Sequence, residues 1–143
     1  MKQFAILLLS VLLSANFMLA QEITGKWKTI DDETGKAKSI VEIYKKNGKL
    51  YGKIVKLINP KEENPKCTKC TDYRKNKPII GMNIITGLTE DDGEWEGDDA
   101  ILDPESGKLY DCKLWIDKDA PNKLNVRGYI GFFFRTQTWY RVK

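Results

Sequence analysis

The chain has 143 residues, no histidine, three cysteines and a formal net charge of +4. The lack of histidine excludes the usual Ser-His-Asp triad, histidine-bearing zinc sites and histidine pH switches, which leaves carboxylate, lysine, tyrosine or thiol chemistry. The positive excess is too small to argue for a nucleic acid or another polyanion as a partner.

The first 20 residues have the pattern of a secretory signal. Lys2 is the only charge before the run FAILLLSVLLSANFMLA, which ends at Ala20. An apolar run this short, broken by serine and asparagine, is typical of a cleaved signal, and a retained membrane anchor is the less favoured alternative. We expect cleavage after Ala20, export to the periplasm or beyond the cell, no membrane span in the mature chain, and a single domain over residues 21–143.

Turn signals divide this domain into short, evenly spaced segments. Asn47-Gly48 and Asp92-Gly93 tolerate the positive φ angles of tight hairpins, and Phe134-Arg135 is a weaker break. The pattern between the turns predicts strands at about 23–31, 38–46, 49–58, 79–88, 93–102, 108–117, 123–131 and 136–142. Consecutive antiparallel strands with short links favour an all-β, eight-stranded up-and-down barrel, and a two-sheet β-sandwich is the alternative.

The two ends of the domain carry a pair of residues that favours the barrel. Gly25-Lys26-Trp27 lies in the first predicted strand and Arg141 in the last. The arrangement resembles lipocalins, in which a glycine-x-tryptophan sits at the closed end of the barrel beneath an arginine from the final strand. A guanidinium over an indole face contributes about 0.5–2 kcal/mol. We therefore expect Gly25, Trp27 and Arg141 to close one end of the barrel.

A set of motifs along the whole mature chain resembles a bacterial family of small secreted proteins known as domain of unknown function 2147. The motifs are GKW, NGKLYGKIVKL, PKCTKC, KNKPIIGM, ILDPESGKLYDCKL, VRGYIG and RTQTWYR, in that order. The resemblance implies a lipocalin-like eight-stranded barrel in an exported protein. It brings no established activity and no catalytic residues.

Two of the three cysteines lie three positions apart in the longest loop, and Cys112 lies on an inward position of a predicted strand. In an exported protein a structural disulfide is favoured, with Cys67–Cys70 preferred over a link from the loop to Cys112. Two alternatives stay open. One is a redox-active thiol favoured by Lys66, Lys69 and Arg74. The other is a metal site in which a carboxylate such as Asp72 or a water completes three thiolates.

Two segments carry opposite charge biases. The loop over residues 59–78 has an excess of lysine and arginine, so an anionic envelope surface is a possible partner, although a solvated loop is favoured. The segment TEDDGEWEGDD concentrates acidic residues around a hairpin. Its spacing fits no EF-hand, so an exposed acidic turn is favoured over a calcium site.

The favoured function is binding of a small, mostly apolar molecule, because an eight-stranded barrel is just wide enough to hold one ligand. The predicted lining residues are Tyr44, Ile54, Met82, Ile84, Leu114 and Tyr129. The alternative is a structural or partner-binding module whose barrel is filled by its own side chains. An enzyme would have to use carboxylates such as Asp103 and Glu105, but LDPESG is ordinary turn composition. We predict no catalytic residue, metal or cofactor, and a non-enzymatic role is favoured.

Overall fold

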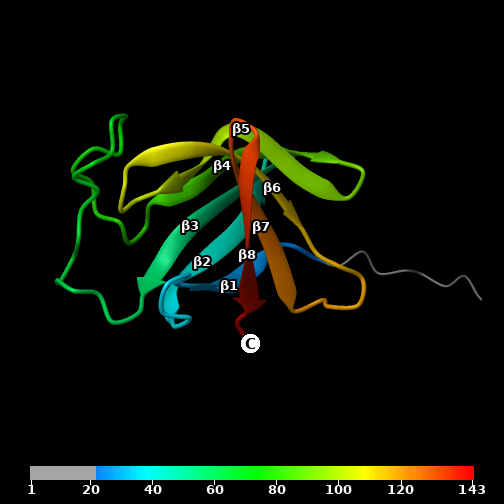
Figure 1. Ribbon diagram of the computed structural model, residues 1–143, viewed down its shortest axis with the longest axis horizontal. Coiled ribbons are helices and arrows are strands. Elements are labelled where there is room, and N and C mark those ends of the chain that lie inside the picture. Colours follow the sequence, from blue (N-terminus) through cyan, green and yellow to red (C-terminus); the bar gives the residue numbers. More distant parts are fainter. Residues whose placement is uncertain (1–21) are drawn as a thin grey trace, which may run out of the picture.

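The computed structural model describes residues 22–143, which form eight antiparallel strands in a closed barrel with sequential order (Figure 1). The strands are β1 (Gly25–Ile30), β2 (Ala37–Lys46), β3 (Lys49–Leu57), β4 (Asn83–Asp91), β5 (Glu94–Asp103), β6 (Lys108–Trp115), β7 (Lys123–Ile130) and β8 (Phe133–Arg141). The predicted barrel is confirmed and the sandwich is excluded. Within residues 22–143 no helix is long and apolar enough to cross a membrane. The predicted signal lies outside the described residues.

The largest differences from the predicted strand boundaries are in β4 and β8. β4 begins at Asn83 rather than near residue 79, because the preceding residues form a turn in which the Met82 N–H donates to the Ile79 carbonyl (3.1 Å). β8 begins at Phe133, so the predicted break at residues 134–135 is wrong. The β7–β8 turn is instead Gly131-Phe132, with Ile130 paired to Phe133 and a Gly131 φ of 57°.

The barrel interior is filled by side chains of its own strands. Alternation along β2 and β3 directs Val41, Ile43 and Leu50 inward, where each is at most 1% exposed. The packing is tight at two strand glycines. A Cβ added to Gly52 would lie 3.1–3.2 Å from side-chain atoms of Ile85 and Val41, and one added to Gly97 would lie 2.9 Å from Leu88 Cδ2. The interior is therefore a close-packed core.

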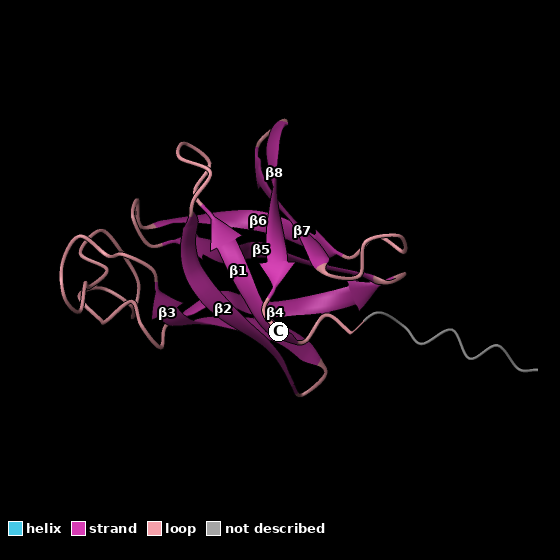
Figure 2. Ribbon diagram, turned by 90° about the horizontal axis from the view of Figure 1, so that it is seen from below, coloured by secondary structure: helices cyan, strands magenta, loops and turns pink. Residues whose placement is uncertain are grey.

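The barrel has two distinct ends. The turns at residues 47–48 and 92–93 lie at one end, which we call the closed end. The loops at residues 31–36 and 58–82 and the turn at residues 104–107 lie at the other, which we call the open end. The β7–β8 hairpin also turns at the open end, and its tip projects beyond the rest of the barrel (Figure 2).

At the closed end, the guanidinium of Arg141 lies over the Trp27 ring, 4.3 Å from its centroid. Trp27 is fully buried and its Nε1–H donates to the Ile23 carbonyl (2.9 Å). Arg141 donates to three backbone carbonyls, those of Glu22 (2.7 Å), Thr24 (3.4 Å) and Pro121 (3.3 Å). Because β1 and β8 share only two register pairs, we infer that Arg141 holds this seam.

Replacing Arg141 with alanine is expected to lower the free energy of unfolding by about 1–3 kcal/mol, because the cation–π contact and the carbonyl hydrogen bonds are lost together. Urea unfolding followed by tryptophan fluorescence measures this loss. Arg127→Ala is the matched control, because Arg127 also lies over an indole, that of Trp115 at 4.9 Å, but does not join β1 to β8. Equal losses in the two variants would contradict the seam role of Arg141.

Candidate functional site

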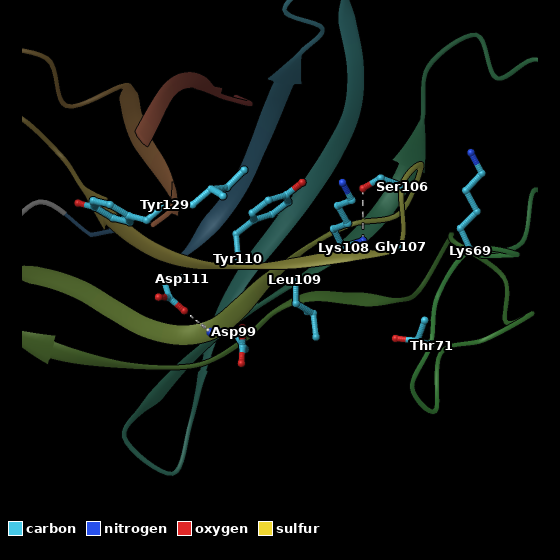
Figure 3. Close-up of a pocket in the computed structure, with 11 residues that line it drawn as sticks. Lys69, Thr71, Asp99, Ser106, Gly107, Lys108, Leu109, Tyr110, Asp111 and Tyr129 are labelled. Atoms are coloured by element: carbon cyan, nitrogen blue, oxygen red, sulfur yellow. Dashed lines mark hydrogen bonds between the residues drawn. The ribbon is translucent and has the colours of Figure 1, made fainter. Parts of the chain in front are cut away.

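A groove of about 580 Å³ lies at the open end, outside the packed core. It runs along the start of β6 between the end of β7 and the disulfide loop (Figure 3). Its volume lies within the range of small-molecule sites in proteins. The lining residues are Lys69, Thr71, Asp99, Ser106, Gly107, Lys108, Leu109, Tyr110, Asp111, Tyr129 and Ile130.

The polar groups of the groove separate into two ends. Lys69, Thr71, Ser106 and Lys108 lie at one end, while Asp99 and Asp111 lie at the other (Figure 3). The Ser106 hydroxyl donates to Asp103 Oδ2 (2.9 Å), so it is held within the turn. Leu109 and Tyr110 lie between the two ends on opposite sides of β6, and Tyr129 lies beside the acidic end (Figure 3). This lining combines apolar surface with a basic, hydroxyl-bearing end and an acidic end.

An irregularity in β5 places Asp99 at the groove. The β5–β6 register shifts between Gly97 and Ile101, and Asp99 has a φ of 47°. The Asp99 N–H donates to Asp111 Oδ1 (2.8 Å), which holds the two acidic residues together. A β-bulge of this kind re-aims a side chain without breaking the sheet.

The rest of the acidic segment forms the β4–β5 hairpin at the closed end, with its turn at Asp92-Gly93. Lys113 contacts the carboxylates of Glu94 (3.1 Å) and Glu96 (3.9 Å). The hydrogen bond that Lys113 donates to Glu94 is the main reason that the pKa of Lys113 is raised above its usual value. Part of the acidic charge is therefore balanced within the sheet.

A disulfide joins Cys67 to Cys70, as predicted, and both cysteines are buried. The loop they brace packs directly on the β5–β6 turn. Cys67 Sγ lies 3.5 Å from the Pro104 carbonyl oxygen, and a Cβ added to Gly107 would lie only 2.0 Å from the Lys69 carbonyl oxygen. The disulfide thus positions Lys69 at the groove wall, an arrangement that favours the structural role over redox chemistry.

The third cysteine, Cys112, stays a free thiol inside the barrel, where desolvation raises its pKa to about 12. A thiol with so high a pKa has almost no thiolate at neutral pH and is a poor nucleophile. Because Cys67 and Cys70 are joined in a disulfide, they cannot act with Cys112 as the three thiolate ligands of the metal site considered in the sequence analysis.

The most buried cation of the disulfide loop is engaged within the protein. Arg74 pairs with Asp72, its Nη2 lying 2.6 Å from Oδ2, and its Nη1 donates to the Asn83 carbonyl (2.9 Å). These contacts tie the loop to the start of β4. Arg74 holds the pKa of Asp72 below its usual value, chiefly through the side-chain hydrogen bond.

The residues predicted to line a ligand site are not brought together. Ile54, Ile84 and Leu114 are buried in the packed core, and Met82 is buried beside a second groove of about 350 Å³ near Arg74. Of the predicted set, Tyr129 alone lines the larger groove.

Tyr44 lies on the outside of the barrel, because alternation in β2 directs Ile43 inward instead. Its hydroxyl donates to Asn83 Oδ1 (2.8 Å) and its ring stacks on Tyr51, with centroids 5.7 Å apart. Its assignment to an interior lining was therefore wrong. The sequence analysis did not identify Lys108 and Tyr110 as groove residues, although both lie in the motif ILDPESGKLYDCKL.

The closed barrel of eight sequentially ordered antiparallel strands has a lipocalin-like fold. Its structure is similar to that of a protein from Helicobacter pylori described as "Protein HP1028 from the human pathogen Helicobacter pylori belongs to the lipocalin family", with a TM-score of 0.71 and 20% identity. The match covers 85% of this chain and 84% of the other, and it shows the fold.

Residues 25–141 match the family described as "Uncharacterized protein conserved in bacteria (DUF2147)". The chain belongs to this family. No curated protein matched the chain.

Replacing Gly107 with alanine is expected to detach the disulfide loop from the β5–β6 turn, because the added methyl group cannot fit against the Lys69 carbonyl. Limited trypsin digestion measures this effect, since the loop carries several lysines. We expect cleavage within residues 61–77 to become faster by on the order of tenfold. Gly35→Ala is the control, because Gly35 has a similar φ of 70° but no neighbour within 4 Å. Equal acceleration in both variants would assign the effect to backbone strain alone.

Replacing Asp72 with asparagine is expected to lower the free energy of unfolding at pH 7 by about 1–3 kcal/mol, because buried Arg74 loses its charged partner. The folded-state pKa of Asp72 is lowered, so its contribution is complete above the unfolded-state pKa and disappears as the pH falls through the folded-state value. The difference between wild type and variant should therefore shrink below a pH of about 4.

Urea unfolding at a series of pH values measures this difference, and Glu63→Gln, an exposed acid in the same loop, controls for the change in net charge. A difference that stays constant down to a pH of about 2 would show that the carboxylate charge of Asp72 is not what stabilises the loop.

Proposed function

We propose that this protein is exported and binds one small, mostly apolar molecule bearing an anionic group in the groove at the open end of the barrel. The observation that supports this proposal is the lining of the groove. Apolar side chains, Lys69 and Lys108 all line the same groove of about 580 Å³. The apolar surface supplies binding free energy through burial, and the lysines supply charge-assisted hydrogen bonds that orient the ligand.

The packed interior favours a ligand site outside the core. The interior site predicted from the sequence, which included Ile54 and Leu114, is less favoured. A ligand inside the barrel would have to displace side chains that are already in contact with one another. Overpacking a close-packed core costs about 1–3 kcal/mol per insertion even for small changes. A molecule in the groove meets Leu109, Tyr110 and Tyr129 without this cost.

The disulfide supports the exported location. Disulfides persist in oxidising compartments and are rare where thioredoxin and glutathione keep thiols reduced. The N-terminal pattern of residues 1–20 is that of a secretory signal. The disulfide also braces one wall of the groove, because Lys69 lies between the two bonded cysteines.

Native mass spectrometry of the protein isolated from its own envelope, without refolding, tests the binding proposal. We expect a mass adduct that disappears when the same sample is denatured. The double variant Lys108→Gln, Tyr110→Ala should lower the bound fraction about tenfold, because it removes a charge-assisted contact and an aromatic surface.

Lys123→Gln is the matched control, since Lys123 also begins a strand and is exposed, but it lies at the closed end. A native mass equal to that of the chain alone, or an adduct unaffected by the groove variant, would contradict the proposal.

A further inference from the structure

The tip of the β7–β8 hairpin is an apolar projection exposed to solvent. Ile130 is 62% exposed, Phe132 103%, Phe133 81% and Phe134 60%. The backbone of the hairpin tip extends past the neighbouring loops (Figure 2). A contiguous apolar surface of this kind marks an interaction site in a soluble protein.

The turn itself imposes this exposure. Ile130 pairs with Phe133, which leaves only Gly131 and Phe132 to reverse the chain. Gly131 adopts the positive φ of 57° that the tight turn needs, and Phe132 follows at the apex. No longer loop is present that could fold the phenyl rings back onto the barrel. The backbone conformation of the turn therefore keeps the phenyl rings exposed to solvent.

Both faces of the hairpin tip are apolar. Directly paired residues share a face, so Ile130 and Phe133 lie on one side while Tyr129 and Phe134 lie on the other. The rings of Tyr129 and Phe134 are in contact, with centroids 6.1 Å apart. A protein partner covers one side of such a hairpin. The boundary region of a lipid bilayer, in contrast, surrounds an inserted tip on every side. A tip with apolar side chains on both faces suits such an environment.

Each face also carries an arginine below the apolar tip. Arg127 lies on the side of Tyr129, with Cζ 4.4 Å from the Phe134 ring centroid, and its Nε–H donates to Thr136 Oγ1 (2.8 Å). In residues 22–143 no carboxylate forms an ion pair with Arg127. Arg135 lies on the other side and is ion-paired with Asp32, which also accepts from Gln137. The side of Arg127 therefore carries the uncompensated positive charge.

The spacing of these groups matches the depth of a membrane interface. Arg135 lies three residues from Phe132, about 10 Å along a strand. Interfacial elements bury their apolar groups about 5–10 Å into the boundary between headgroups and acyl chains. With the phenyl rings at that depth, the guanidinium of Arg135 reaches the level of the lipid phosphates. Arg127 begins one register pair further down the hairpin, but its guanidinium extends toward the tip, 4.4 Å from the Phe134 ring centroid.

We propose that the β7–β8 hairpin tip inserts into the interface of an anionic lipid bilayer, with Arg127 and Arg135 contacting the lipid phosphates. The tip supplies apolar burial and the arginines favour phosphate-bearing, negatively charged lipids. Tyr129 and Ile130 also line the groove, but the residues changed to test the docking, Phe132, Phe133 and Arg127, do not. Vesicle binding could fail while the mass adduct persists, so the two proposals are tested separately.

Flotation with vesicles tests the docking, using the protein as the expressing cell processes it. Vesicles of phosphatidylglycerol and phosphatidylcholine in equal parts are compared with pure phosphatidylcholine. We expect wild type to float with the mixed vesicles and the double variant Phe132→Ser, Phe133→Ser to bind at least about tenfold more weakly. Tyr73→Ser is the matched control, since Tyr73 is 71% exposed but lies on the disulfide loop, and it should bind as wild type does.

Two further measurements keep the outcome decisive. Arg127→Gln should weaken binding to the mixed vesicles about fivefold and leave the weak binding to phosphatidylcholine unchanged. If the serine variant fails to fold, Phe132→Trp replaces it, and its fluorescence should be quenched by brominated lipid more strongly than that of wild type.

Wild type that stays with the buffer, or a folded tip variant that floats equally well, would overturn the proposal. Sedimentation equilibrium showing a dimer that the tip variant abolishes, without vesicle binding, would instead make the tip a contact between two copies of the chain.

Discussion

The packed interior of the barrel is the constraint on which the rest of the structure depends. The side chains of Val41, Leu88 and Ile85 lie so close to Gly52 and Gly97 that a Cβ at either position would require its neighbours to shift. Such packing gives the barrel stability through burial, and it also closes the space in which related architectures hold a ligand. Any binding surface must therefore be built outside the core, from loops and strand ends that the core positions.

The disulfide loop shows how such a surface is built. A loop of this length would lie loosely over the barrel mouth without internal bonds. The Cys67–Cys70 bond, the Arg74–Asp72 pair and the close contact of Gly107 with Lys69 each remove some of that freedom. Together they turn a lysine-rich segment into one wall of a groove. The cysteines thus contribute to the candidate site by placing Lys69, rather than by chemistry of their own.

The barrel could be predicted from the sequence because the alternation of apolar and polar residues and the preferences of turn residues act locally. Both patterns are present in β2, β3, β6 and β7 of the structure. The sequence did not predict the groove, because this depends on the bulge at Asp99 and on contact between segments far apart in the chain. The phase of alternation was also ambiguous where Ile43 and Tyr44 are adjacent and both suit a core. The break between the last two strands was predicted at Phe134-Arg135, but the turn lies at Gly131-Phe132, so Phe133 and Phe134 belong to β8.

The open end unites the two surfaces that the packed core leaves available. Tyr129 and Ile130 line the groove and also belong to the base of the apolar tip, so the hairpin is a wall of the first and the stem of the second. Because β7 and β8 are paired through to Ile130 and Phe133, the stem is continuous with the barrel sheet. A bilayer that held the tip would lie beside the groove, within reach of a molecule that is itself mostly apolar. The two proposed functions, membrane contact and ligand binding, would therefore share the open end of the barrel, while at the closed end Arg141 lies over Trp27 and contributes to stability.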